Sequence, residues 1–281
     1  MLATATPSAV ADRWFALSAA AAALSAVASA AGLLAPSIYA RETPLWAAQG
    51  AGQDAVTLLA AAAILAAAWY ARRGGIAATL VWLGLTLYLA YSYVLYAFFV
   101  HFNALFLVYV AVLGLSAYAT AGAAADVARR NWDGRFAAAK GERALAGLMI
   151  VAAIAFAGLW LSEIVPALAA GGPPPSARDA GLIVNPVHVL DLGLVIPAML
   201  ASGALLWRRR TIGFLAALPL AAFMVTMGVA IVGMAMAMSV RGLGSPAAAA
   251  PMAALSAVTA LLATRVLRSI RASAEAAVEL L

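Results

Sequence analysis

Residues 185–210 read NPVHVLDLGLVIPAMLASGALLWRRR, and this stretch decides the class of fold. A single carboxylate, Asp191, is followed by an apolar run and then by Arg208-Arg209-Arg210. At ~1.5 Å of rise per residue, the helix between the acid and the arginines is roughly 25–27 Å long, just under the ~30 Å hydrocarbon core of a bilayer. The stretch therefore predicts a membrane-spanning helix with an acid near one face and arginines at the other.

The same spacing occurs earlier in the chain, where Asp54 precedes Arg72-Arg73. Asp54 and Asp191 are 137 residues apart, as are Arg72 and Arg209. This suggests a duplication of four helices plus four in parallel orientation, because an even number of spans returns the chain to its starting side. Chance alignment of Ala- and Leu-rich helices is the alternative.

The composition favours a membrane protein over a soluble domain with a large core. Of the 281 residues, 66% are hydrophobic and only 10% are charged, whereas soluble domains have about 25% charged residues. Runs of about 20 apolar residues are long enough to cross a bilayer as helices. We therefore predict an all-α, polytopic bundle of eight spans, at 14–36, 54–71, 76–97, 102–121, 144–165, 187–207, 212–240 and 251–268.

The basic residues predict the orientation of this bundle. With eight spans and the N-terminus inside, fourteen of the 17 Lys and Arg lie in cytoplasmic segments and only Arg41, Arg178 and Arg241 lie outside. The positive-inside rule therefore predicts N-in and C-in. The net charge of +6 then indicates contact with anionic lipid rather than with nucleic acid. The Ala- and Arg-rich, Lys-poor composition is typical of a high-GC bacterium, so we expect the bacterial cytoplasmic (inner) membrane.

Four segments follow from this topology. They are a first transmembrane half (1–121), an interfacial connector (122–143), a second transmembrane half (144–268) and a cytoplasmic tail (269–281), which is expected to form a short surface helix. The first span also has a small-residue motif at Val27–Ala30 that suits signal-peptide cleavage, but its length favours a membrane helix.

Several kinds of chemistry are excluded or disfavoured. The chain has no Cys, which excludes disulfides, thiol catalysis and iron–sulfur clusters. Its one lysine, Lys140, lies in a polar loop, which excludes a retinal Schiff base. It has no HExxH, Walker A or GxSxG motif. Methionines of the seventh span and two histidines leave copper as an alternative, but Met234 and Met236 alternate and do not share a helical face. We predict no metal and no cofactor.

The polar residues of the spans gather at their predicted external ends. This arrangement predicts a polar pocket that opens to the outside and binds a small molecule. The candidate ligand-binding residues are Asp191, His188, Asn185, Asp54, Gln53, Glu163, Tyr91, Tyr88, Asn103 and His101.

Asn185, His188 and Asp191 form the sharpest element, because a spacing of three places them on one helical face. An intramembrane carboxylate is costly and needs a partner or a wet cavity, which favours a binding or proton-transfer site. A structural His–Asp contact between helices is the alternative. Asp54 has its own alternative, since an acid at a helix start caps backbone N–H groups. Glu163 is expected at the water boundary, where an acid needs no special partner.

The aromatic and loop candidates have ordinary alternatives as well. Tyr88 and Tyr91 share a face with Ser92 and are deep enough to line a pocket, but interfacial aromatic belts also concentrate tyrosine. His101 and Asn103 lie at a short external turn, where side chains are commonly solvated.

The chain resembles uncharacterised multi-pass bacterial inner-membrane proteins, and this resemblance implies no activity. It depends on Gln49-Gly50, Gln53-Asp54, Asn185-Pro186, Asp191, the triple arginine and Gly213. Three functions remain open. The first is a transporter or channel-like protein for a small solute or ion. The second is a one-sided ligand-binding, sensory or accessory protein, which the lack of polar residues in the inner halves favours. The third is an intramembrane enzyme acting on lipid-linked substrate through Asp191, His188 and Glu163.

Overall fold

The computed structural model describes residues 10–132, 134–137 and 139–279, with side chains to residue 270. All regular structure in this part of the chain is helical. The long helices are α1 (Asp12–Leu34), α2 (Pro44–Arg72), α3 (Ile76–Phe99), α4 (Phe106–Ala128), α5 (Glu142–Ala169), α9 (Thr211–Val240) and α10 (Ala250–Glu279). The sixth span is composite, with α7 (Pro186–Leu190), a π-helical turn (Asp191–Val195) and α8 (Ile196–Trp207). Short helices are η1 (Pro36–Tyr39), α6 (Pro175–Ala180) and η3 (Pro246–Ala249).

Within the described residues, eight helices are long and apolar enough to cross a membrane, which confirms the predicted number. The chain is therefore a multi-pass helical membrane protein. The second helix was placed wrongly, because α2 begins at Pro44 rather than at residue 54, with Thr43 as its N-cap. The sequence run Gln49–Gln53 is polar and glycine-containing, so hydropathy alone delays the start. α10 continues without a break to Glu279, so the backbone of the predicted tail is helical over the described residues.

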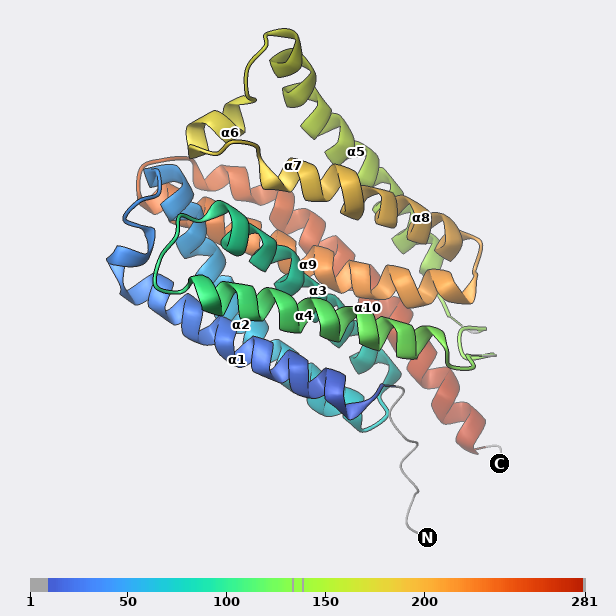
Figure 1. Cartoon of the computed structure of the whole chain (residues 1–281). Helices are drawn as coiled ribbons and strands as arrows, with labels where there is room; N and C mark the ends of the chain where they lie inside the picture. The colour runs from blue at the N-terminus through green and yellow to red at the C-terminus, as the bar shows by residue number, and fades with distance from the viewer. Residues whose placement is uncertain (1–9, 133, 138, 280–281) are drawn as a thin grey trace.

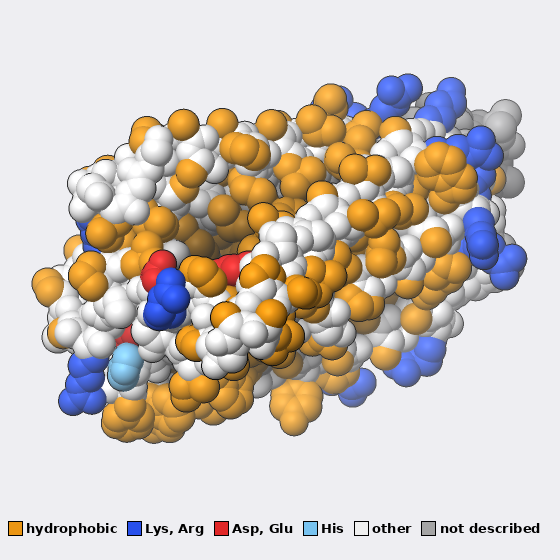
Figure 2. Space-filling model, turned by 90° about the horizontal axis from the view of Figure 1, so that it is seen from above, with side chains coloured by type: hydrophobic (Ala, Val, Ile, Leu, Met, Phe, Trp, Pro, Cys, Tyr) orange, Lys and Arg blue, Asp and Glu red, His pale blue; other side chains and the backbone are white. Residues whose placement is uncertain are grey.

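One end of the bundle carries most of the basic side chains, and we call it the basic end (Figure 2). α1 begins and α10 ends there, as Figure 1 shows. Ion pairs of described residues at this end include Arg72 Nε 3.1 Å from Asp12 Oδ1 and Arg129 Nη2 2.6 Å from Asp126 Oδ1. The loops after α1, α3, α5 and α9 lie at the opposite end (Figure 1).

The first four long helices pack as a closed bundle in which α1 contacts both α2 and α4, and α3 contacts α2 and α4. α9 packs on this bundle against α2 and α3. Glycine allows the close approach, because a Cβ on Gly52 would lie 2.5 Å from the Gly233 carbonyl oxygen and one on Gly84 would lie 2.1 Å from that of Pro219. α8 and α10 flank α9, and α5 packs mainly on α8.

The connector between the halves is fixed to the basic end. Phe136 stacks on Phe214 of α9 with ring centroids 4.7 Å apart. Arg209 pairs with the buried carboxylate of Glu142 and donates to the carbonyl oxygen of Ala137 at 2.9 Å. The triple arginine therefore includes a clamp that joins the start of α5 to the α8–α9 turn. Asp133 and Ala138, within the predicted connector, lie outside the described residues.

The outer half of α5 separates from the bundle. Its buried residues all lie between Glu142 and Ala153, and none occurs from residue 154 to the end of the helix. Figure 1 shows α5 sloping away from α7 and α8 towards an apex, from which the chain returns through α6. Packing at the base and separation at the apex leave a space between α5 and α9–α10.

Candidate functional site

A cavity of about 460 Å³ lies in this space, in the half of the bundle away from the basic end. Its walls come from α2, α3, α5, the composite sixth span, α9 and α10. The space-filling view shows a hollow in the predominantly apolar surface with acidic side chains close to its edge (Figure 2). The cavity therefore opens on the side of the bundle, between the α5–α6 segment and the last two helices.

Most of the cavity wall is apolar, and methionine side chains form much of it. Six of the nine methionines of the chain line it, namely Met199, Met224, Met227, Met234, Met238 and Met252. Met236, which alternates with two of them, is instead exposed on the outer face of α9. Methionine is flexible and polarisable, so a wall of this kind adapts to apolar ligands of different shape.

Asp191 is the charged group of the cavity wall. Tyr91 Oη donates to Asp191 Oδ1 at 2.9 Å, and Trp160 Nε1 donates to Oδ2 at 2.9 Å. The carboxylate begins the π-helical turn that follows α7. Such turns add a residue to the helix and are frequent at functional sites. Side chains from α3, α5 and the sixth span therefore meet in one polar group, the Asp191 carboxylate with its two donors, within an apolar wall.

A second polar group of residues borders this point. His188 Nε2 lies 3.3 Å from Glu163 Oε2, and the Trp160 and His188 rings are 4.9 Å apart. Glu163 Oε1 accepts from the backbone N–H of Ser176, and Asn185 donates to the Ser176 hydroxyl at 2.9 Å. Asn185 also caps α7 by accepting from the Val187 N–H at 2.9 Å. These contacts attach the segment containing α6 to both α5 and α7.

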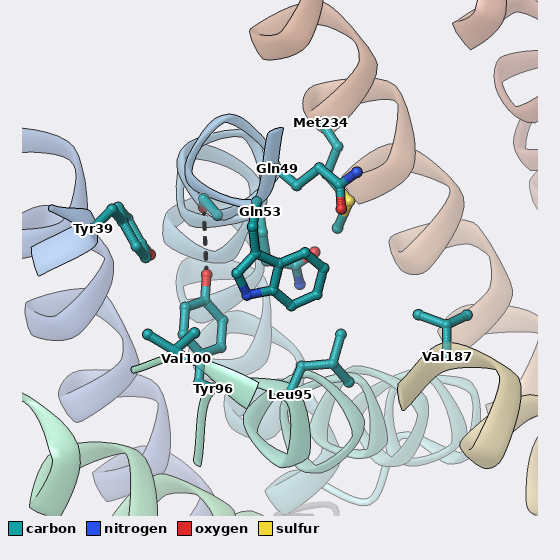
Figure 3. A pocket seen from close by; sticks show the side chains of 10 residues that line it. Tyr39, Gln49, Gln53, Leu95, Tyr96, Val100, Val187 and Met234 are labelled. Atoms are coloured by element: carbon teal, nitrogen blue, oxygen red, sulfur yellow. Dashed lines mark hydrogen bonds between the residues drawn. The ribbon is translucent and has the colours of Figure 1, made fainter. Parts of the chain in front are cut away.

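A small pocket of about 70 Å³ adjoins the cavity and is lined by Tyr39, Gln49, Gln53 and Met234, among others (Figure 3). Gln49, Gln53 and Met234 line both spaces. Gln53 Nε2 donates to Tyr88 Oη at 2.8 Å and to Ser92 Oγ at 2.9 Å. The Gln53 side chain is thus held between the wall of the cavity and the polar interior of the first bundle.

Asp54 lies behind this wall and is only 1% exposed. Tyr39 Oη donates to its Oδ2 at 2.6 Å and Tyr96 Oη to its Oδ1 at 2.8 Å. Burial, together with the nearby Asp54 charge, raises the pKa of Tyr39 well above its ordinary value, so its hydroxyl stays a proton donor. The capping interpretation of Asp54 was wrong, because the cap is Thr43 and Asp54 lies well inside α2.

The structure separates the predicted site residues into four groups. Those that line the cavity are Asp191, Asn185, Gln53 and Tyr91. His188 and Tyr88 contact this set without lining the cavity, and Glu163 is joined to it through His188. Asp54 is buried with its tyrosines. His101 and Asn103 are elsewhere. His101 is exposed and donates its backbone N–H to Glu42 at 2.7 Å, and Asn103 accepts from the Leu105 N–H at the start of α4.

Sequence reasoning missed Trp160, Gln49, Ser176 and the cavity-lining methionines. The signal for Trp160 was present, because it lies three residues before Glu163 and so shares its helical face. Ser176 had no comparable signal, since its position depends on how the segment after α5 folds back. No group of three or more His, Cys, Asp or Glu that could hold a metal occurs in the described part of the chain.

No protein-family model, curated protein or solved structure matches this chain. The function is therefore inferred from the cavity and its chemistry.

Proposed function

We propose that this membrane protein binds an amphipathic small molecule in the cavity between α5 and α9–α10, from one side of the membrane. The main support for this proposal is the cavity itself. Its volume of about 460 Å³ lies within the roughly 300–1,000 Å³ typical of small-molecule sites. Its polar residues include Asp191, Asn185 and Ser176 from the sixth span and the α6 segment, with Gln49, Gln53 and Ser92 from α2 and α3, while methionine and aromatic side chains form much of the remainder. An apolar body with a polar head fits such a site.

The packing towards the basic end favours binding over transport. The second half of the bundle is filled there by apolar side chains that are at most 2% exposed, namely Leu145, Met149, Leu206, Phe214 and Leu218. A transport path would cross this layer, so transport requires a second conformation in which these side chains part. A packed layer of this kind closes the cavity on one side and supports a receptor or accessory role.

The geometry favours binding over catalysis as well. Asp191 accepts hydrogen bonds from two neutral donors, which position it as a fixed acceptor. His188 and Glu163 face each other and do not line the cavity. An acid–base pair that acts on a bound substrate has to reach it, by contact or through one water molecule.

The binding proposal can be tested by site-resolved photolabelling in nanodiscs. A long-chain neutral alcohol carrying a diazirine should label residues 224–238 of α9. Ala235→Trp fills the cavity and should abolish this labelling, because Ala235 lines it. Val229→Trp places the same side chain on an exposed position of the same helix and should leave labelling intact. Equal labelling of both variants, or uptake of the probe into sealed proteoliposomes only when the protein is present, would refute one-sided binding.

The membrane topology is part of the proposal. The basic end is cytoplasmic, both termini face the cytoplasm of a bacterium, and the exposed arginines contact anionic lipid, because basic residues are retained on the cytoplasmic side. The absence of Cys allows single-cysteine labelling. An impermeant maleimide should label Ala170→Cys in intact cells and Arg135→Cys only after permeabilisation. The reverse pattern would invert the orientation.

We further propose that the two halves arose by duplication. The order of neighbours supports this, because α5, the sixth span, α9 and α10 pack in the same succession as α1 to α4, with α5 and α10 less closely packed. The cavity then occupies the position where the second bundle is open. A superposition of α1–α4 on the second set that gave no common arrangement would contradict the duplication.

A further inference from the structure

The charge of the cavity wall is unbalanced. Asp191 lines the cavity, and none of the described residues lining it is Lys or Arg. The ion pairs formed by described residues include none between Asp191 and a basic side chain. At this end of the bundle, Arg178 pairs instead with the exposed Asp179. A carboxylate in an apolar wall without a fixed cation is a place where a mobile cation is favoured.

The neighbouring titratable groups do not reverse this sign. Glu163 adds a second carboxylate, and among the described residues His188 is the group acting on Asp191 that can carry positive charge. If His188 is neutral, the cluster carries two negative charges when both acids are ionised. If His188 is protonated, it faces Glu163 at 3.3 Å and Asp191 is still uncompensated. With both acids ionised, the cluster is therefore anionic in either state of the histidine.

The two groups that hold Asp191 are neutral donors. The Tyr91 hydroxyl and the Trp160 indole N–H each occupy one site on the carboxylate, which has about four acceptor positions in total. They fix the direction of the carboxylate without cancelling its charge. Capacity to accept from a ligand N–H therefore remains on both oxygens.

Aromatic rings complete the surroundings of this carboxylate. Phe156, Trp160, Tyr91 and Phe223 all line the cavity, and the Tyr91 and Phe223 rings are 5.4 Å apart. The negative face of an aromatic ring attracts organic cations, and rings combined with an acid are suited to ammonium groups. An anionic head at the same place would be repelled by Asp191.

We infer that the ligand of this cavity is a lipophilic organic cation, an amine or quaternary ammonium with a hydrocarbon body, whose head binds at the remaining acceptor positions of Asp191, beside the aromatic rings that line the cavity. The inference rests on the proposed binding function and specifies its ligand class. The methionine-lined wall accepts the hydrocarbon body, and the lateral opening admits it from the membrane.

Three photoreactive probes of one chain length test this inference, with a primary amine, an alcohol or a carboxylic acid as the head. Nanodiscs of phosphatidylcholine alone are used, so that anionic lipid does not concentrate the amine. The amine should half-saturate labelling of residues 224–238 at a concentration about tenfold lower than the alcohol, and the acid should label least. Asp191→Asn should raise the half-saturating concentration of the amine by about tenfold and leave that of the alcohol nearly unchanged.

Asp179→Asn is the matched control, because it removes an exposed charge at the same end of the bundle. It should leave all three probes unchanged. Equal labelling by amine and alcohol in the native protein would overturn the inference and indicate that Asp191 holds a proton instead. So would an Asp191→Asn variant that keeps the amine preference. If this variant fails to fold, the order of the three probes on the native protein still decides. Failure of every probe to label α9 would instead refute the proposed function.

Discussion

Tyr96→Phe removes one hydroxyl from the buried Asp54 cluster and tests whether this cluster anchors the first bundle. Tyr96 donates to Asp54 Oδ1 at 2.8 Å in a fully buried setting. A hydrogen bond to a charged group contributes about 1.5–3 kcal/mol, and its loss leaves a buried carboxylate oxygen without that donor. We expect a loss of about 2 kcal/mol in the free energy of unfolding. At roughly 2–4 °C per kcal/mol for chains of this order of size, Tm should fall by about 4–8 °C.

Tyr93→Phe is the matched control on the same helix. Tyr93 is equally buried, but its hydroxyl contacts only a backbone oxygen, that of Ser25, at 3.4 Å. We expect a loss of about 0.5–1 kcal/mol for this neutral and long hydrogen bond. Thermal unfolding in detergent, followed by tryptophan fluorescence, measures both variants. Equal shifts for Tyr96→Phe and Tyr93→Phe would refute the anchoring role, and Asp54→Asn combined with Tyr96→Phe should show non-additive losses.

Two further predictions concern packing and the connector. Gly52→Ala should lower the free energy of unfolding by about 1–3 kcal/mol, because its new Cβ meets the α9 backbone at 2.5 Å. Gly114→Ala is the control in the same unfolding assay. It should be neutral or slightly stabilising, because no atom lies within 4 Å of the new Cβ. Arg209→Ala should speed chymotrypsin cleavage of the connector, because it leaves buried Glu142 unpaired. Arg208→Ala removes an equal charge and should not change the cleavage rate. Equal cleavage rates for the two variants would show that the clamp has no structural role.

The spans could be predicted from the sequence because bilayer thickness sets a length that hydropathy detects directly. The predicted eighth span, 251–268, lies within α10, and the predicted third, 76–97, nearly coincides with α3. The start of α2 could not be predicted in this way. Its first turns contain polar Gln49 and Gln53, which pack against other helices and the cavity rather than lipid. Hydropathy measures transfer to lipid and does not detect a polar helix turn that is buried in protein.

The site was predictable where periodicity places residues on one helix and unpredictable where separate helices meet. The spacing of Asn185 and Asp191 identified one polar face, and both line the cavity. The partner of Asp191 on α5, Trp160, depends on the angle between two helices, which the sequence of neither one specifies. Asp54 and Asp191 looked equivalent in sequence, yet one is sealed among tyrosines and the other lines the cavity.

The separation of α5 from the bundle distinguishes two parts of the chain. One part forms the packed core, and the other determines the width of the cavity. The clamp of Arg209 on Glu142 fixes the base of α5, while its outer half is joined to neighbouring segments chiefly through Glu163 and Trp160. A small change of tilt about that base changes the width of the cavity mouth greatly at the apex and very little in the core. Under the proposed binding function, a tilt of α5 about its base would admit ligands of different size with little change in the packing of α1–α4.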